Sequence, residues 1–247
     1  MREPSGLIEP DSESEKRLVA LNPVATAVST FTGWMEIASG GRVSSGAVDA
    51  RLGPQVMSMV ASRAAYYPPR PGFSALTHAQ RERLFGSFDF EDIEGSDEIR
   101  ITRHDPEYRI VNTNIPPLES IPTLSGRFRA NGRVRCHELA APRFRALFAA
   151  WDRFGLTSRI HHFSGPYVAR YKRGVVHDGR AQSLSNHAWG TAIDLNVPQN
   201  RLGRPPARIG EEGCLLELVP IANDLGFYWG GHFSGRLDGM HFEIAQL

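Results

Sequence analysis

The stretch SNHAWGTAIDL, residues 185–195, carries the clearest indication of fold and chemistry in the chain. Along a predicted strand, Ala192 and Asp194 share one face and the apolar residues beside them share the other. Asp194 therefore ends a face of small residues that can border a pocket. His187 precedes Gly190, where the backbone can fold back. The two polar side chains can then meet at one ion, although their spacing fits neither a helix nor a strand.

A second stretch near the C-terminus, DGMHFE at residues 238–243, places His241 three residues after Asp238. Imidazole and carboxylate are both normal zinc ligands, and two histidines with one carboxylate leave a fourth position for water. Zinc lowers the pKa of such a water to about 7, so a carboxylate can remove its proton at neutral pH. Either stretch alone is common by chance. Together they indicate a catalytic zinc site with Asp238 placed to act as the base.

The pattern Ser-x-His-x-x-Gly-x-Ala-x-Asp followed by Asp-x-x-His-Phe-Glu resembles the VanY-like zinc peptidases. These include D-Ala-D-Ala carboxypeptidases and the L-alanyl-D-glutamate endopeptidases of phage endolysins. The resemblance extends to YVARYKRG at residues 167–174 and GFYWGG at residues 226–231, and covers about residues 134–247. It implies a VanY/hedgehog-like fold, in which a small antiparallel sheet with flanking helices carries a single zinc ion. The zinc ligands that it implies are His187, Asp194 and His241.

The same resemblance implies roles for the residues around the metal. Asp238 matches the catalytic acid/base, where the carboxypeptidase branch often has Glu, so this chain looks more like the endopeptidase branch. Arg170 matches the arginine that stabilises the oxyanion or holds a substrate carboxylate, with Arg173 as the second choice. Ser185 looks like a contact to substrate or to a ligand, and Trp229 like a wall of the pocket.

Most of the other histidines have no partner in the sequence pattern. His232 follows the Trp-Gly-Gly turn and is a candidate to line the cleft, whereas His177 is expected to be exposed. Glu243 has two open interpretations: it orients a ligand histidine, or it is an ordinary salt-bridge partner.

The resemblance implies hydrolysis of an amide bond in the peptidoglycan stem peptide, with the L-Ala-D-Glu bond expected first. Removal of a terminal D-Ala is the alternative within the class. An endopeptidase needs room on both sides of the scissile bond, whereas a carboxypeptidase needs a closed end with a cation. A third hypothesis is an inactive, metal-stabilised cell-wall-binding module, against which the presence of both ligands and base argues.

Apolar periodicity predicts secondary structure over the C-terminal part of the chain. An amphipathic helix is expected at residues 143–154, with aromatic and leucine side chains on its buried face. Short strands are expected near residues 99–101, 108–111, 160 and 192–197. A helix near residues 212–225 must be kinked or restarted by Pro220. No repeating βαβ order is visible, which favours an α+β fold.

The N-terminal part is predicted to be separate: residues 1–100 as a helical region with a Pro-rich linker, and residues 101–247 as the catalytic domain. Asn22-Pro23 is typical of a helix start, followed by a weaker helix near residues 55–65. The proline-dense residues 66–72 are expected to be extended. Thr77 with Gln80 forms a capping-box pattern. The region is either a wall-anchoring module or an extension that packs on the catalytic domain.

The charge balance of 28 basic and 27 acidic residues provides no single-sign field for binding nucleic acid or anionic lipid. Cys136 and Cys214 are expected to be buried thiols or, alternatively, one long-range disulfide. The first 16 residues are polar and acidic, unlike a conventional signal peptide, and no apolar run is long enough to span a bilayer. We therefore expect synthesis in the cytoplasm and action on the cell wall after release by another route. The sequence does not indicate an oligomeric state.

Overall fold

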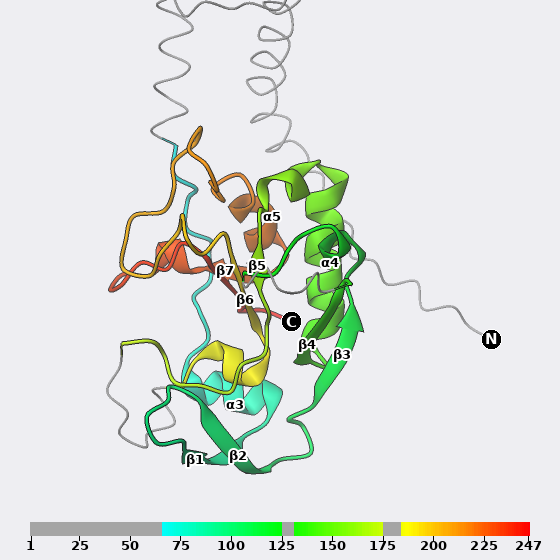
Figure 1. Cartoon of the computed structure of the whole chain (residues 1–247), viewed down its shortest axis with the longest axis vertical. Helices are drawn as coiled ribbons and strands as arrows, with labels where there is room; N and C mark the ends of the chain where they lie inside the picture. Colours follow the sequence, from blue (N-terminus) through cyan, green and yellow to red (C-terminus); the bar gives the residue numbers. More distant parts are fainter. Residues whose placement is uncertain (1–65, 125–130, 175–183) are drawn as a thin grey trace, which may run out of the picture.

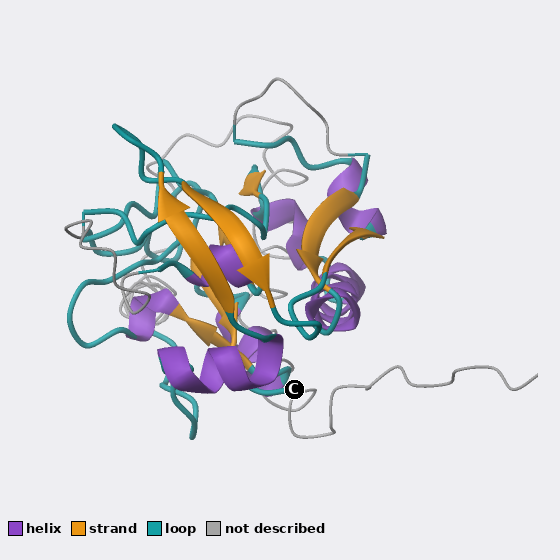
Figure 2. Cartoon of the chain, turned by 90° about the horizontal axis from the view of Figure 1, so that it is seen from below, coloured by secondary structure: helices purple, strands orange, loops and turns teal. Residues whose placement is uncertain are grey.

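The computed structural model describes residues 66–124, 131–174 and 184–247. The helices expected near residue 22 and at residues 55–65, and the exposed position expected for His177, lie outside this range. The described chain mixes helices with small antiparallel sheets (Figures 1 and 2).

A four-stranded antiparallel sheet with the order β5-β6-β8-β7 lies at the centre of the C-terminal part. Its strands are β5 (Phe163–Ser164), β6 (Ala192–Leu195), β7 (Phe227–Trp229) and β8 (His241–Ile244). Every residue of β6 and β8 is buried, so both faces of the sheet are covered. The register pairs Asp194 with His241 directly across the two strands. The fold thus brings two distant motif residues side by side through ordinary strand pairing.

Helix α4 (Ala140–Arg153) supplies much of the apolar core beside this sheet. It follows the hairpin of β3 (Ile110–Asn114) and β4 (Arg133–His137), with the short 3-10 turn η1 (Pro116–Glu119) in their connection. The predicted apolar face is confirmed: Phe144, Leu147, Phe148 and Trp151 are buried, and Phe154 is partly buried. The Trp151 ring lies 5.6 Å from that of Phe242 on β8, so the helix packs directly against the sheet.

Two expected elements differ in their bounds from the prediction. The strand expected near residue 160 begins later, as β5, because residues 156–159 form the 3-10 turn η2 (Leu156–Arg159). The strand expected to reach residue 197 ends at Leu195, where Asn196 adopts a positive φ of 46°. Helix α5 (Val219–Asp224) carries Pro220 in its first turn, so this proline starts a helix rather than kinking one.

Residues 66–104 pack on the same core rather than standing apart. Helix α3 (His78–Phe85) has the predicted capping box at Thr77 and Gln80, and β1 (Phe88–Asp92) pairs with β2 (Ile99–His104). The expected division after residue 100 falls inside β2. Phe85 is fully buried in the cluster that also contains α4, and the indole of Trp189 donates to the carbonyl of Gly86 at 2.9 Å. Residues 66–104 thus contribute to the core that α4 also forms, and residues 1–65 lie outside the described range.

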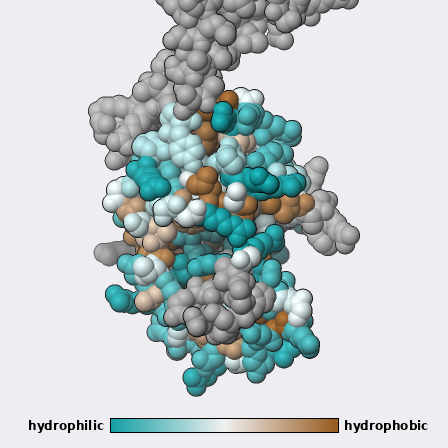
Figure 3. Space-filling view, turned by 90° about the vertical axis from the view of Figure 1, so that its left-hand side faces the viewer, coloured by the Kyte–Doolittle hydropathy of each residue, from teal (hydrophilic) through white to brown (hydrophobic). Residues whose placement is uncertain are grey.

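Both cysteines are buried and free, which confirms the prediction of thiols rather than a disulfide. Burial raises the pKa of each thiol. On the face drawn in Figure 3, hydrophilic residues predominate and hydrophobic ones form small groups. Within the described residues, none of the helices has the length and apolar character needed to cross a membrane.

Candidate metal centre

Three side chains from distant parts of the chain converge at the predicted metal site. His187 Nε2 lies 3.2 Å from Asp194 Oδ1, and His241 Nδ1 lies 2.9 Å from the same oxygen. One ligand atom from each residue lies within 4.8 Å of the others. This separation suits three donors around one ion, and imidazole with carboxylate is a donor set that zinc accepts. The structure therefore brings together the three residues predicted to be ligands.

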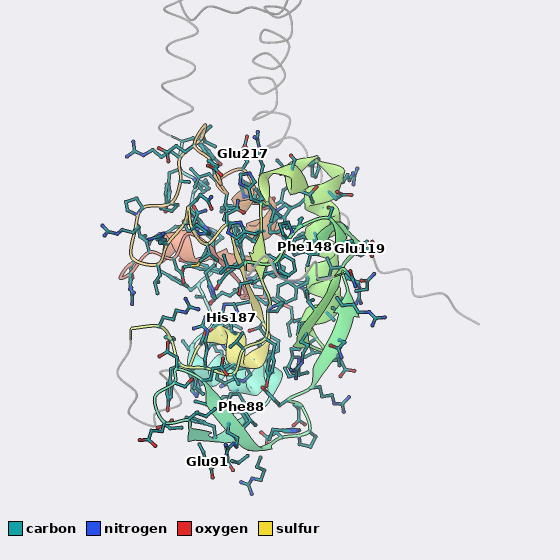
Figure 4. The ribbon with its side chains drawn as sticks, in the orientation of Figure 1. Phe88, Glu91, Glu119, Phe148, His187 and Glu217 are labelled. Atoms are coloured by element: carbon teal, nitrogen blue, oxygen red, sulfur yellow. The ribbon has the colours of Figure 1, made fainter. Side chains whose placement is uncertain are left out.

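The histidine of the first motif is placed by a short turn. His187 lies on η4 (Asn186–Trp189), a 3-10 turn beneath the four-stranded sheet in Figure 4, and Ser185 caps this turn by accepting from the His187 amide. Gly190 ends the turn with φ at +66°, and a Cβ there would lie 2.8 Å from the backbone nitrogen of His137. Only glycine fits this left-handed, crowded position. The predicted fold-back at Gly190 is confirmed.

Each histidine is oriented by the ring nitrogen that does not face Asp194. His187 Nδ1 donates to the carbonyl of Pro166 at 3.1 Å, and His241 Nε2 donates to Glu243 Oε2 at 3.0 Å. The amide of Asn186 also donates to this Glu243 oxygen. Such outer contacts fix the tautomer and direction of a metal-binding imidazole. Of the two interpretations of Glu243, the geometry favours the residue that orients His241.

The electrostatics of the cluster favour a bound cation. Burial raises the pKa of the Asp194 carboxyl, but His187 and His241 outweigh burial and hold it well below its usual range. Burial lowers the pKa of His241, but Asp194 and Glu243 raise it to about 10. Two buried carboxylates therefore stabilise positive charge at one point. His187 Nε2 is buried and lies close to Asp194 Oδ1 without the geometry of a hydrogen bond, so it is suited to donate its lone pair to a metal.

Asp238 lies on the loop before β8 and borders the same pocket as the three ligands. Its Oδ1 is buried and has no hydrogen-bond partner among the described residues, while its backbone amide donates to Gly230 at 3.0 Å. Burial raises the pKa of this carboxyl to about 6, with Asp194 adding to the shift and His241 opposing it. A carboxyl with such a pKa can accept and return a proton near neutral pH.

Two pockets meet at the metal cluster. The smaller, about 280 Å³, contains all three ligands and Asp238 and is bordered by four basic residues, Arg170, Lys172, Arg173 and Arg236. The larger, about 690 Å³, is bordered by the turn of the β1–β2 hairpin at residues 95–98. His187 and Asp194 border both pockets. Two connected spaces thus adjoin the candidate metal position.

The predicted substrate residues fall into two groups. Ser185, Arg170 and Arg173 border the pockets, with Arg170 half-buried and Arg173 exposed. The charges of Asp194 and Asp238 act on Arg170, although burial dominates and lowers its pKa. This favours Arg170 as the arginine nearer to the reacting atoms.

Trp229 and His232 do not border either pocket, and their predicted place at the cleft is corrected. Trp229 is fully buried and its indole donates to the carbonyl of Gly239 at 2.8 Å. His232 Nε2 donates to the carbonyl of Pro68 at 2.9 Å. Both side chains pack behind the loop that carries Asp238, because the Trp-Gly-Gly turn directs them inward.

Several residues of the site gave no signal in the sequence. Asn186, Lys172 and Arg236 were not predicted, and neither was the wall at residues 95–98. Lys172, Arg236 and residues 95–98 lie outside the helices and strands, and Asn186 lies on η4 next to His187. Their residue types alone did not distinguish them from the neighbouring positions.

A buried His-Asp-His cluster that could hold a metal ion thus lies beside a carboxyl and two pockets. Residues 178–244 match the family model described as D-alanyl-D-alanine carboxypeptidase, which confirms the resemblance to the VanY-like peptidases over this segment. The matched range contains the three ligands and Asp238, but neither Arg170 nor residues 66–124. No curated protein and no solved structure matches the chain.

Proposed function

We propose that this protein is a zinc-dependent peptidoglycan peptidase of VanY-like fold that hydrolyses an amide bond of the stem peptide. The observation that carries the proposal is the joint placement of His187, Asp194 and His241 beside the partner-free carboxyl oxygen of Asp238. The family match supports the class of substrate. The proposed place of action is the cell wall.

Zinc bound to the three ligands would polarise the scissile carbonyl and lower the pKa of a water molecule. Asp238 takes a proton from this water while the water oxygen adds to the carbonyl carbon. The same carboxyl then delivers the proton to the amide nitrogen, the C–N bond breaks, and an acid and an amine are released. Arg170 stabilises the negative charge that develops on the carbonyl oxygen. Glu243 and the Pro166 carbonyl keep both imidazoles in the orientation that binding requires.

We propose the L-Ala-D-Glu bond as the scissile bond, because two pockets adjoin the metal position and together leave room for more of a peptide than one terminal residue. The charge distribution agrees with a peptide that crosses the site. Four basic side chains border the smaller pocket, and two of them, Arg170 and Arg173, also border the larger one beside Asp97 and Glu98. The basic residues are suited to bind a carboxylate of the substrate, and the two acidic residues leave room for an amine further along the larger pocket.

Removal of a terminal D-Ala is the second candidate, because the same basic residues are suited to bind a free terminal carboxylate. The description of the matching family favours this activity. A wall-binding module without catalysis, the third candidate, needs no pocket-facing Asp238.

Mass spectrometry of muropeptides after incubation with the zinc-loaded protein separates these candidates. A new amino terminus at D-Glu supports the endopeptidase, and loss of one alanine supports the carboxypeptidase. Elemental analysis of the same sample measures the zinc content. A protein that carries one zinc per chain, binds walls and releases no product would establish the binding module instead.

A further inference from the structure

The Pro-rich segment, residues 66–71, lies against the Trp-Gly-Gly turn, which consists of Trp229 and the 3-10 turn η5 (Gly230–His232) and precedes Asp238. Figure 1 shows this part of the chain, in cyan, passing the C-terminal elements on its way to α3. The Tyr67 hydroxyl donates to the carbonyl of Gly231 at 2.5 Å, and its ring lies 5.4 Å from that of Trp229. From the turn, His232 donates back to the Pro68 carbonyl at 2.9 Å. The segment and the turn are thus joined by reciprocal hydrogen bonds.

The Trp-Gly-Gly turn is itself hydrogen-bonded to the loop that carries Asp238, the proposed base. The carbonyl of Gly230 accepts from the Asp238 amide at 3.0 Å, and the Trp229 indole donates to Gly239 at 2.8 Å. A Cβ on Gly230 would lie 2.5 Å from the Asp238 carbonyl oxygen and 2.9 Å from its Cβ. The backbone of the turn therefore touches Asp238 directly, and a shift of the turn must move the carboxyl.

Tyr67 contributes little to the core, since 47% of it is exposed. Its contribution is the hydroxyl bond, which fixes one carbonyl of the Gly-Gly turn. Glycine loses more conformational freedom on ordering than any other residue, so two in succession make a turn that needs outside support. This support comes from two hydrogen bonds in opposite directions: Tyr67 donates from the segment to the turn, and His232 donates from the turn to the segment.

We propose that Tyr67 and His232 are positioning residues for Asp238, and that the Pro-rich segment, outside the family match, is part of the catalytic unit. The proposal rests on the proposed function, in which Asp238 is the base. Proton transfer requires the base within hydrogen-bond reach of the attacking water, so a small displacement of the loop lowers the rate of the chemical step. Binding of metal and substrate depends on other residues and should change little.

Tyr67→Phe is the sharpest variant, because it keeps the ring against Trp229 and removes only the hydroxyl. Loss of one such bond corresponds to a roughly 3- to 10-fold lower kcat. We expect KM and zinc content to stay unchanged. His232→Leu should lower kcat as well, and His232→Gln should restore part of it because the amide can still donate to Pro68.

Thr77→Ala is the matched control. It removes the capping box of α3, which should lower the free energy of unfolding by ~1 kcal/mol, yet it contacts neither the turn nor the pocket. Its kcat should equal that of the wild type. Equal kcat values for Tyr67→Phe and Thr77→Ala would overturn the proposal.

Hydrogen exchange of residues 229–240 tests the same point without any substrate. Exchange should rise in Tyr67→Phe and stay at the wild-type level in Thr77→Ala. If the wild type cleaves no muropeptide but the exchange differs in this way, the proposed function fails and the support of the turn stands. If cleavage is normal and the exchange of both variants is unchanged, the support by Tyr67 is refuted.

Discussion

The two regions that meet at the site are held together by different kinds of bond. At the metal cluster within residues 184–247, polar side chains bind other side chains, as in the contact of His241 with Asp194 and with Glu243. Residues 66–124 attach to this part through bonds that end on the main chain: Tyr67 on Gly231, Trp189 on Gly86, and Tyr108 on Ala188. The side-chain contacts of the cluster require a particular residue type on both sides. The contacts that end on the main chain require one donor side chain and any backbone carbonyl opposite it.

This difference predicts different responses to substitution. Removing one partner of the side-chain cluster leaves buried charge without compensation and removes a metal ligand, so the loss should be nearly complete. Removing one contact of the second kind costs packing or a single hydrogen bond, so the loss should be graded. The predictions below follow this order.

His187→Ala should have the largest effect. It removes a ligand, so the purified protein should lose most of its zinc, and kcat should fall by more than the ~10⁴-fold upper range for a lost general base. Elemental analysis and muropeptide cleavage measure the two losses together. As a control, His104→Ala changes an exposed histidine outside the pockets and should retain both. A His187→Ala protein with full zinc content would remove this residue from the ligand set.

Asp238→Ala should separate catalysis from metal binding. We expect kcat to fall ~10²- to 10⁴-fold because the proton acceptor is lost, while the zinc content stays at the wild-type level. Asp224→Ala, at an exposed position at the end of α5, is the control and should be fully active. Full activity of Asp238→Ala would refute the assigned base.

Phe85→Ala tests the packing of residues 66–124 against β4. The side chain is fully buried and its ring lies 5.0 Å from His137 across the junction of α3 and β4. Truncation should lower the free energy of unfolding by about 3–5 kcal/mol, as for other buried phenylalanines. Leu84 is the exposed neighbour of Phe85 and provides the control: Leu84→Ala should change the free energy of unfolding by no more than about 0.5 kcal/mol.

Thermal unfolding monitored together with zinc release shows whether the regions form one unit. If Phe85→Ala lowers both transitions together, the two regions unfold cooperatively. If zinc release keeps its wild-type temperature, residues 66–104 unfold as a separate unit. The two regions would then differ because they are separate domains, and not because their hydrogen bonds are of different kinds.

The same contrast explains which features could be predicted from sequence. The convergence of His187, Asp194 and His241 could be predicted because metal chemistry uses few residue types and because the two motifs together resemble a family pattern. Strand alternation and a glycine indicated the directions of Asp194 and His187. Helical period likewise predicted the buried face of α4. Both inferences depend on the side-chain type and its spacing in the sequence.

The attachment of residues 66–124 could not be predicted, because its acceptors are carbonyls of Gly231, Gly86 and Ala188, which any residue can supply. Trp229 was placed wrongly for a related reason. An aromatic residue before two glycines suits a pocket wall as well as a core, and only the fold decides between them.

Acidic pH should weaken the junction of β4 with residues 66–124 through His137, the smallest effect in the series. Its Nε2 lies 3.1 Å from the Phe85 carbonyl and 2.9 Å from that of Glu107, and its Nδ1 accepts from the Leu139 amide. Burial lowers the pKa of this histidine in the folded protein, although the carbonyl bonds and Glu138 oppose the shift. The unfolded chain, with a pKa near 6.5, then binds protons first as pH falls. The free energy of unfolding should therefore be highest above about pH 6.5 and decline below it.

His137→Gln should reduce this decline relative to the wild type, at the cost of lower stability at pH 7. Chemical denaturation of zinc-saturated protein at several pH values between about 5 and 8 measures both. Comparing variants cancels the protons taken up by the metal ligands, which are common to all. The exposed His104→Gln should keep the wild-type slope. An unchanged slope in His137→Gln would mean that protonation of this imidazole does not cause the decline, because the slope reports only the protons taken up on unfolding. Its hydrogen bonds to the two carbonyls would then contribute to stability equally at every pH in this range, and the decline would come from other titrating groups.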